Sequence, residues 1–460
     1  MLTREQQNII YHEGNLYVNA KAGSGKTTTL LEYAKIRKAF SFLYLVYNQS
    51  IKEEAQKKFP PNTTVETIHS LAYKAIGHQY KQKLTNNLKA DTIIENSREL
   101  KRKPFEEAFK LSLQILNILK YFFNSNQTSI TEELCYHDPL IFKITNDIYQ
   151  QMIDINNKNM PITHDCYLKL YHLTNPILDF DYILIDEAQD SNPVMLDIIY
   201  KQQANKIFVG DPHQKIYSFR NAINVFSKDN PYYKPNEFQT LTLSKSFRFG
   251  KNIAKIANQI LKKFKNENKL IIGNEDKKDF IGPLDKNEPY TIISRTNAKV
   301  FENAYMLARQ GKTFGIVGGL EQLLSPIKDI FYLYKGQKDL ISRDSIKKFK
   351  NYHSFKKLTE ELKIAEFKFL IKIIDTFGDS LAEAISLIEK YHRGIKLGEV
   401  ILTTSHKSKG LEFLNVKIDN DFGLLGIDDL EEDEINLVYV AVTRAIEHLE
   451  LNSNLNELFL

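Results

Sequence analysis

The sequence predicts an α/β protein with two parallel-sheet domains, each interrupted by a helical insertion. Short apolar runs alternate with stretches of helical spacing through residues 15–75, a pattern typical of a parallel sheet flanked by helices. A second alternating region starts near Leu241. Residues 80–160 and 335–395 instead show long amphipathic helical spacing and few β-branched runs. The length of 460 residues is too great for one ordinary core and suggests about two to four domains.

The predicted strands and helices follow these patterns in chain order. In the first region we expect a strand at 16–20, a helix at 27–40, a strand at 42–46, a helix at 51–59, an amphipathic helix at 105–123, and strands at 182–186 and 206–211. In the second region we expect strands at 290–295, 314–317, 400–404 and 416–419.

These elements define the expected domain boundaries. The first domain comprises residues 1–80 and 161–240, with the insertion at 81–160. The second comprises residues 241–334 and 396–460, with a smaller insertion at 335–395.

The loop after the first strand has the residue types of a phosphate-binding loop. Backbone N–H groups of such a loop cradle phosphates, its Lys reaches them, and its Thr hydroxyl binds Mg²⁺. The loop alone is a weak signal, because Gly and Lys are common and Ala20 stands where the strict pattern has its first Gly. The predicted nucleotide-binding residues here are Ala22, Gly23, Ser24, Gly25, Lys26 and Thr27.

Two adjacent carboxylates supply the second half of a nucleotide triphosphatase. Asp186 and Glu187 follow the apolar run 182–185, so a buried strand delivers both to its carboxyl end. Paired acids at a strand end are often only a solvated turn. Together with the phosphate loop, however, they predict an ATP site in which Asp186 and Thr27 hold Mg²⁺ and Glu187 orients the attacking water.

Composition excludes several classes of protein. The apolar share of 42% is ordinary for a globular protein, and no apolar run reaches the ~18–20 residues of a membrane helix. The N-terminus is polar and lacks a secretory signal core, and two cysteines make neither a disulfide framework nor a zinc cluster. We therefore expect a cytoplasmic protein. The net charge of +5 permits nucleic-acid binding without arguing for it.

Further motifs occur in a fixed order along the chain. They occupy residues 2–6, 67–72, 210–220, 243–248, 294–297, 404–413 and 436–445. In this order the chain resembles the UvrD/Rep-like helicases of superfamily 1. Residues 42–51, 163–169 and 209–214 resemble the F-box DNA helicases more closely, here without the F-box. The resemblance implies two RecA-like P-loop domains and ATP-driven work on DNA.

The resemblance assigns roles around the nucleoside of ATP. Gln6 resembles the glutamine that reads the adenine edge, and Phe247 stands where a Tyr usually stacks on adenine. Glu412 resembles the residue that contacts the ribose. Thr28 stands where many relatives carry an Arg against the base, so nucleotide selectivity is expected to be loose.

The resemblance also assigns roles around the phosphates. Gln214 resembles the γ-phosphate sensor, and Arg248 and Arg444 resemble arginine fingers from the second domain. Phosphoryl transfer needs such cations because charge spreads over the γ-phosphate oxygens in the transition state. The expected catalytic set is therefore Lys26, Asp186, Glu187, Gln214, Arg248 and Arg444.

Candidate DNA contacts come from the same motifs. Phe219 occupies the place of an aromatic that stacks on single-stranded bases, although most of the 28 Phe residues will be core. The other positions that resemble DNA-contacting residues are Asn48, Thr67, His69, Arg220 and His406. A lone His is usually structural, so His69 and His406 gain weight only from their motifs.

Two functions remain open from the sequence. The first is an ATP-dependent 3′→5′ translocase and helicase that acts on single-stranded DNA and 3′-tailed duplexes in repair, recombination control or phage defence. The second is an ATP-gated DNA-binding subunit that regulates a protein partner, such as a nuclease or repair factor. The intact carboxylates, glutamine and arginines favour the first.

Overall fold

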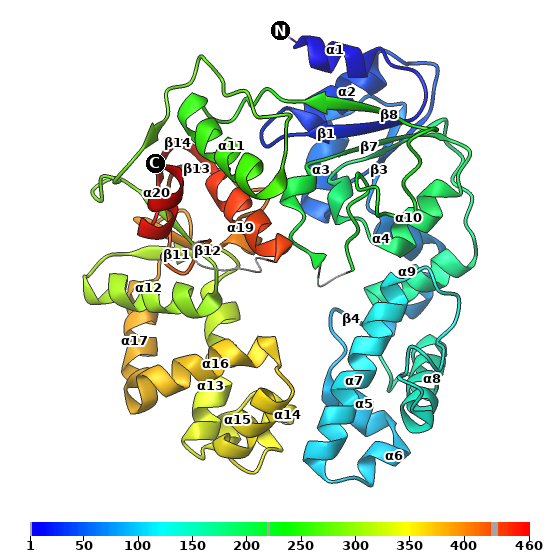
Figure 1. The fold of residues 1–460 in the computed structure, drawn as a ribbon. Helices are drawn as coiled ribbons and strands as arrows, with labels where there is room; N and C mark the ends of the chain where they lie inside the picture. The colour runs from blue at the N-terminus through cyan, green and yellow to red at the C-terminus, as the bar shows by residue number, and fades with distance from the viewer. Residues whose placement is uncertain (1, 219–220, 425–430) are drawn as a thin grey trace. The chain divides into compact units, whose positions relative to one another are not determined.

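The computed structural model describes residues 2–218, 221–424 and 431–460, and it comprises two compact units, Met1–Ser244 and Lys245–Leu460. Each unit is built on a six-stranded sheet in which every pairing is parallel, with helices packed on the faces (Figure 1). The predicted α/β fold class with two parallel sheets is therefore confirmed.

The sheet of the first unit has the strand order β3-β2-β6-β7-β1-β8. Its strands are β1 Leu16–Ala20, β2 Phe42–Leu45, β3 Thr63–Glu66, β6 Tyr182–Ile185, β7 Asn205–Gly210 and β8 Gln239–Leu243. The central strands β2 and β6 are buried along their whole length, which explains why their sequences are continuous apolar runs.

Alternate residues of these strands enter two cores, one on each face of the sheet. Leu16 and Val18 of β1 pack in the core that includes α2 (Lys26–Lys35), whereas Tyr17 packs in the opposite core with Phe208 and Phe238. Because the strands are parallel, the loops that follow β1, β6 and β7 emerge at one edge of the sheet. That edge carries the phosphate loop, the paired carboxylates and the segment after Gly210.

Helices of the first unit surround this sheet and form its insertion. The helices outside the insertion are α1 Arg4–Ile10, α2, α3 Gln49–Lys58, α4 Ile68–Ala75, α9 His164–Leu173 and α10 Pro193–Tyr200. The insertion contains α5 Ala90–Asn96, α6 Arg98–Lys101, α7 Phe105–Asn124 and α8 Pro139–Ile153. A short parallel pair, β4 (Leu84–Thr85) with β5 (Ile162–Thr163), brackets it.

The second unit repeats the architecture with the order β11-β12-β10-β13-β14-β9. Its strands are β9 Phe280–Ile281, β10 Tyr290–Ser294, β11 Phe314–Ile316, β12 Val400–Thr404, β13 Phe413–Ile418 and β14 Ala445–Glu450. Its helices are α11 Lys251–Lys265, α12 Asn297–Arg309, α13 Leu320–Tyr334, α14 Asp344–Lys347, α15 Tyr352–Glu361, α16 Ala365–Phe377, α17 Leu381–Tyr391, α18 Ser405–Ser408, α19 Glu432–Val442 and α20 Ser453–Phe459.

Two boundaries differ from those expected. Strand β8 pairs in parallel with β1, so the first unit continues to Ser244 rather than ending at 240. The helical segment between β11 and β12 begins with α13 at Leu320, not at 335. Among the residues that the structure describes, no helix has both the length and the apolar character needed to cross a membrane.

Candidate nucleotide and DNA site

The phosphate loop connects β1 to the N-terminus of α2. Gly23 and Gly25 adopt left-handed backbone conformations with φ of 71° and 76°, which only glycine takes without strain. Ser24 lies buried in the loop, and no group in residues 2–218, 221–424 or 431–460 forms a hydrogen bond with its Oγ. A buried hydroxyl without a partner and a helix N-terminus are together suited to a bound phosphate.

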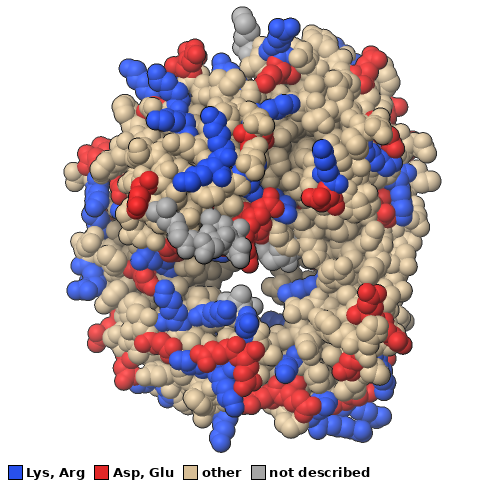
Figure 2. Space-filling view, in the orientation of Figure 1, with Lys and Arg blue, Asp and Glu red and all other residues tan. Residues whose placement is uncertain are grey.

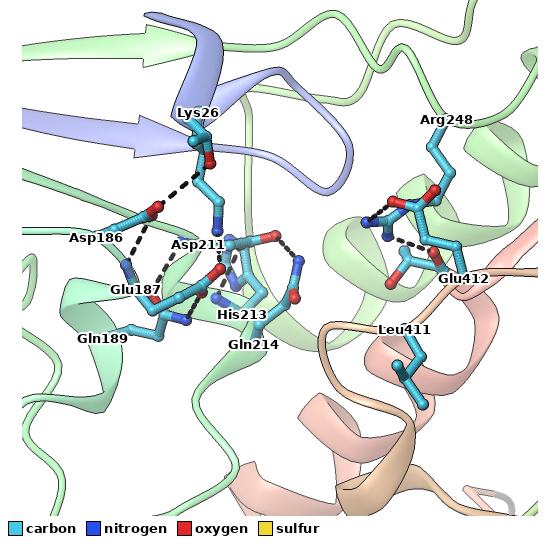
Figure 3. A network of polar contacts seen from close by, with 12 residues as sticks. Lys26, Asp186, Glu187, Gln189, Asp211, His213, Gln214, Arg248, Leu411 and Glu412 are labelled. Atoms are coloured by element: carbon cyan, nitrogen blue, oxygen red, sulfur yellow. Dashed lines mark hydrogen bonds and ion pairs between the residues drawn. The ribbon is translucent and has the colours of Figure 1, made fainter. Parts of the chain in front are cut away.

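The paired carboxylates meet the phosphate loop at the edge of the sheet (Figure 3). The Nζ of Lys26 lies 2.6 Å from Oε1 of Glu187, and Oγ1 of Thr27 lies 3.4 Å from Oδ2 of Asp186. A hydroxyl and a carboxylate are oxygen ligands of the kind that Mg²⁺ prefers, so Thr27 and Asp186 would suit this ion. Residues of the first unit are enough to form the expected association of the phosphate loop with the paired carboxylates.

Burial and mutual charge set the protonation of this cluster. Burial raises the pKa of Asp186; the Lys26 ammonium opposes that rise, and the neighbouring Glu187 adds to it. Burial by itself would lower the pKa of Lys26, but the carboxylates of Glu187 and Asp186 outweigh it and raise that pKa. Lys26 therefore stays cationic, and a bound divalent cation would favour the ionised form of Asp186.

Tyr44 is a member of this cluster that the sequence analysis did not identify. Its buried hydroxyl donates a 2.7 Å hydrogen bond to Oδ2 of Asp186, and its ring stacks on Phe59 at a centroid distance of 4.4 Å. The pairing of Leu45 with Ile185 sets β2 beside β6 and brings the two side chains together. The only sequence signal was a Tyr inside an otherwise apolar strand.

The loop after β7 carries the expected γ-phosphate sensor. Gln214 is buried in the short helix η3 (Pro212–Gln214), and its Nε2 donates a 2.8 Å hydrogen bond to Oδ2 of Asp211. The backbone N–H of His213 donates to the other carboxylate oxygen of Asp211. Asp211 thus holds this loop in one conformation beside the carboxylate cluster (Figure 3).

The residues expected at the nucleoside belong to both units. Gln6 is buried, accepts a hydrogen bond from the Thr3 N–H and donates to Oγ1 of Thr29, while Thr28 is exposed on α2. In the second unit, Phe247 has an exposed fraction of 37%, which leaves its ring available for stacking. The structure does not test the roles predicted for Gln6, Thr28 and Phe247.

The two predicted arginine fingers lie together in the second unit. Arg248 donates a 2.7 Å hydrogen bond to the Thr443 carbonyl and forms a 2.7 Å ion pair with Glu412 (Figure 3). Arg444 is 1% exposed and donates to the carbonyls of Val440 and Leu411. In the described part of the chain, the buried Nε of Arg248 has no hydrogen-bond partner, and a phosphate oxygen would satisfy it.

A cavity of about 1170 Å³ in the first unit is lined by two predicted DNA contacts and by the paired carboxylates. Asn48, His69, Asp186 and Glu187 all line it. Asn48 caps α3 and is exposed, and His69 forms a 3.0 Å contact with Asp165.

Of the four remaining predicted DNA contacts, the structure describes two. Thr67 is buried, and its hydroxyl caps α4. His406 lies in α18 of the second unit and is partly buried. Phe219 and Arg220 lie outside the described residues.

Two tyrosines in the same cavity are candidate DNA contacts that the sequence analysis missed. Tyr47 and Tyr217 line the cavity with their rings stacked, at a centroid distance of 5.8 Å and an interplanar angle of 11°. Tyr47 is 40% exposed, which is unusual for a large aromatic in a folded unit. Both occur within segments that carried the family resemblance, so the signal was present in the sequence.

Known proteins match the chain over these motifs. A family profile described as the UvrD/REP helicase N-terminal domain matches residues 2–234. F-box DNA helicase 1 of Gallus gallus is 33% identical over 513 residues, covering 99% of this chain and 49% of that protein. F-box DNA helicase protein 1 of Schizosaccharomyces pombe is 32% identical over 519 residues, covering 100% and 58%.

A more distant relative extends the comparison. ATP-dependent DNA helicase PcrA of Staphylococcus aureus is 24% identical over 301 residues, covering 57% of this chain and 40% of PcrA. The chain spans about half the length of the F-box helicases that it matches. Because the family profile covers the phosphate loop, the paired carboxylates and the sensor loop in one continuous match, the chain belongs to the UvrD/Rep helicase family.

Proposed function

We propose that the protein is an ATP-dependent single-stranded DNA translocase and helicase that moves 3′→5′. The observation that carries the proposal is the convergence of Lys26, Thr27, Asp186 and Glu187 at one edge of the first sheet. Asp186 and Glu187 also line the cavity that contains Asn48 and His69, so the paired carboxylates and candidate DNA contacts share one cavity.

The residues have distinct tasks in ATP hydrolysis. Lys26 neutralises phosphate charge, and Thr27 with Asp186 would hold Mg²⁺, which supplies charge neutralisation at the phosphates when bound. Glu187 is placed to orient a water for in-line attack. Arg248 and Arg444 of the second unit are proposed to complete the site, because the transition state spreads charge over the γ-phosphate oxygens. Closure of the units would then depend on ATP.

DNA binding is proposed to use stacking and polar contacts more than a single basic patch. Lys and Arg side chains are interspersed with Asp and Glu over the face shown in Figure 2. Tyr47 and Tyr217 offer rings for bases, and base–aromatic stacking is worth about 1–3 kcal/mol per base and tolerates any sequence. The proposed substrates are single-stranded DNA and 3′-tailed duplex.

The test measures ATPase activity with and without single-stranded DNA, followed by strand displacement on duplexes with only a 3′ or only a 5′ tail. We expect DNA to stimulate ATPase and the 3′ tail to be preferred. The likeness of residues 404–413 and 437–445 to the UvrD group supports that polarity. Preference for the 5′ tail would contradict only the proposed polarity. No ATPase activity, with or without single-stranded DNA, would contradict the proposed translocase.

The second candidate function is an outcome of the same test. Nucleotide-dependent DNA binding without translocation or strand displacement would identify an ATP-gated subunit that regulates a partner such as a nuclease or repair factor. We also propose a cytoplasmic, reducing location, supported by the free, buried thiols of Cys135 and Cys166.

A further inference from the structure

Gln189 lies between the paired carboxylates and the loop that carries Gln214 (Figure 3). It is completely buried, and both ends of its amide are engaged. Its Nε2 donates a 2.6 Å hydrogen bond to Oε2 of Glu187, and its Oε1 accepts a 3.1 Å hydrogen bond from the backbone N–H of Asp211. The Gln189 side chain therefore connects Glu187, the residue proposed to orient water, with the loop that carries Gln214.

Gly210, which precedes Asp211, leaves room for this amide because it has no side chain. A Cβ added to Gly210 would lie 2.2 Å from Oε1 of Gln189, which is closer than any real Cβ contact. Gly210 does not have a left-handed backbone conformation, so its own backbone would tolerate a side chain. The added Cβ would also lie 3.0 Å from the backbone N of Ala188 and 3.2 Å from the Phe226 ring, so the Gln189 amide makes the shortest of three close contacts.

We propose that Gln189 is a positioning residue that sets the orientation of the Glu187 carboxylate according to the position of the loop from Asp211 to Tyr217. The proposal rests on the proposed function, because it describes how DNA at Tyr217 would influence hydrolysis. The side chain of Asp211 accepts a hydrogen bond from Gln214, while its N–H donates to Gln189. A shift of this loop therefore moves the donor that anchors the amide.

The ion pair of Glu187 with Lys26 is less suited to this task during hydrolysis. Lys26 lies 2.6 Å from Glu187, but phosphates bound at the loop would compete for its ammonium. The Gln189 amide is anchored by a backbone N–H that phosphate does not displace. Glu187 also has a left-handed backbone with φ of 50°, an uncommon conformation for a residue with a side chain and one often found at functional sites.

The experiment is a double-mutant cycle of Gln189→Ala and Gly210→Ala, with kcat of the ATPase, DNA stimulation and nucleotide affinity measured for each protein. Loss of a hydrogen bond to a charged group, here used to orient Glu187, should lower kcat about 10- to 100-fold. Binding of a fluorescent ATP analogue should stay within about threefold. The double variant should match Gln189→Ala within about threefold, because the 2.2 Å contact of the added Cβ with the amide is then gone. The contacts that remain, at 3.0 Å from the Ala188 backbone N and 3.2 Å from the Phe226 ring, require only small shifts of these neighbours.

Two further variants separate positioning from stability. Gln189→Glu keeps the shape and the acceptor for the Asp211 N–H but cannot donate to Glu187, so it should lose kcat as Gln189→Ala does. Gln202→Ala is the matched control: Gln202 is a buried glutamine of the same unit, hydrogen-bonded through Oε1 to the Leu178 N–H and through Nε2 to the Pro176 and Ile198 carbonyls. It should lower the melting temperature and leave kcat unchanged.

Defined outcomes overturn the proposal. Multiplying losses in the cycle would show that Gly210 acts independently of Gln189. A kcat within threefold of wild type in Gln189→Glu and Gln189→Ala, or nucleotide affinity falling in step with kcat, would show a structural role only. If wild type hydrolyses ATP without DNA stimulation and the variants still lose that turnover, the positioning role stands and the proposed DNA coupling fails.

Discussion

Replacing Tyr44 by Phe tests the contact that most directly holds the predicted Mg²⁺ carboxylate. The substitution removes one hydroxyl, which donates a 2.7 Å hydrogen bond to Oδ2 of Asp186. Both the ring and its stacking on Phe59 remain. Because Tyr44 is 0% exposed, solvent has no ready path to replace the lost donor.

The expected size of the effect follows from this geometry. A hydrogen bond to a charged group contributes about 1.5–3 kcal/mol, and its loss leaves a buried acceptor short of one partner. In a unit of this size about 1 kcal/mol shifts Tm by about 2–4 °C, so Tm should fall by about 3–12 °C. Loss of a side chain that orients a metal ligand typically weakens metal binding about 10- to 100-fold.

The assay titrates Mg²⁺ against binding of a fluorescent ATP analogue, so it does not depend on turnover. Tyr33→Phe is the matched control, since Tyr33 is equally buried in the same unit and donates its hydroxyl to the His12 carbonyl at 3.0 Å. The control should lose stability but keep the wild-type Mg²⁺ dependence. If Tyr44→Phe and Tyr33→Phe show the same Mg²⁺ dependence within twofold, Tyr44 does not position the metal ligand.

Three further predictions follow from the site and the core. Lys26→Ala and Glu187→Gln should both abolish turnover, but only Lys26→Ala should weaken nucleotide binding, because Lys26 is proposed to contact phosphate and Glu187 to act on water. Near-normal turnover in Glu187→Gln would show that the catalytic role is assigned to the wrong residue. Arg248→Ala should lower kcat about 10³-fold or more with little change in nucleotide affinity, as expected of an arginine finger. Arg444→Ala should lower kcat similarly and should also lower Tm, because the Arg444 side chain is buried and donates hydrogen bonds to two backbone carbonyls. If either variant keeps ATPase activity within a few-fold of wild type, that arginine is structural. Burial lowers the pKa of Lys169 from 10.5 to about 8, so between these pH values the unfolded chain binds more protons than the folded one, and the free energy of unfolding should rise by about 1.5 kcal/mol from pH 8 to 9.5. Denaturant unfolding should show that Lys169→Met lacks this rise. The same dependence of the free energy of unfolding on pH in the variant and the wild type would refute the assignment.

The amino-acid sequence alone predicted the fold class, the phosphate loop and the paired acids. These features are local: each buried strand is a continuous apolar run, and each motif lies directly after its strand. The strands at 16–20 and 182–186 were placed within one residue of β1 and β6. Gly23 and Gly25, named from the loop pattern, adopt the left-handed backbone conformations that such a loop uses.

Only the tertiary structure decided which of these segments touch. The sequence analysis assigned Leu241 to the second domain, but β8 is a strand of the first sheet, since strand pairing depends on packing between segments far apart in the chain. The contact of Tyr44 with Asp186 requires β2 beside β6, and the fit of Gln189 against Gly210 requires β6 beside β7. Such neighbours are 21 to 142 residues apart along the chain, as the Gln189–Gly210 and Tyr44–Asp186 pairs show, and no local pattern records them. Local residue patterns therefore determined which functional groups this protein has, whereas the order of strands in the sheet determined which side chains contact and orient those groups.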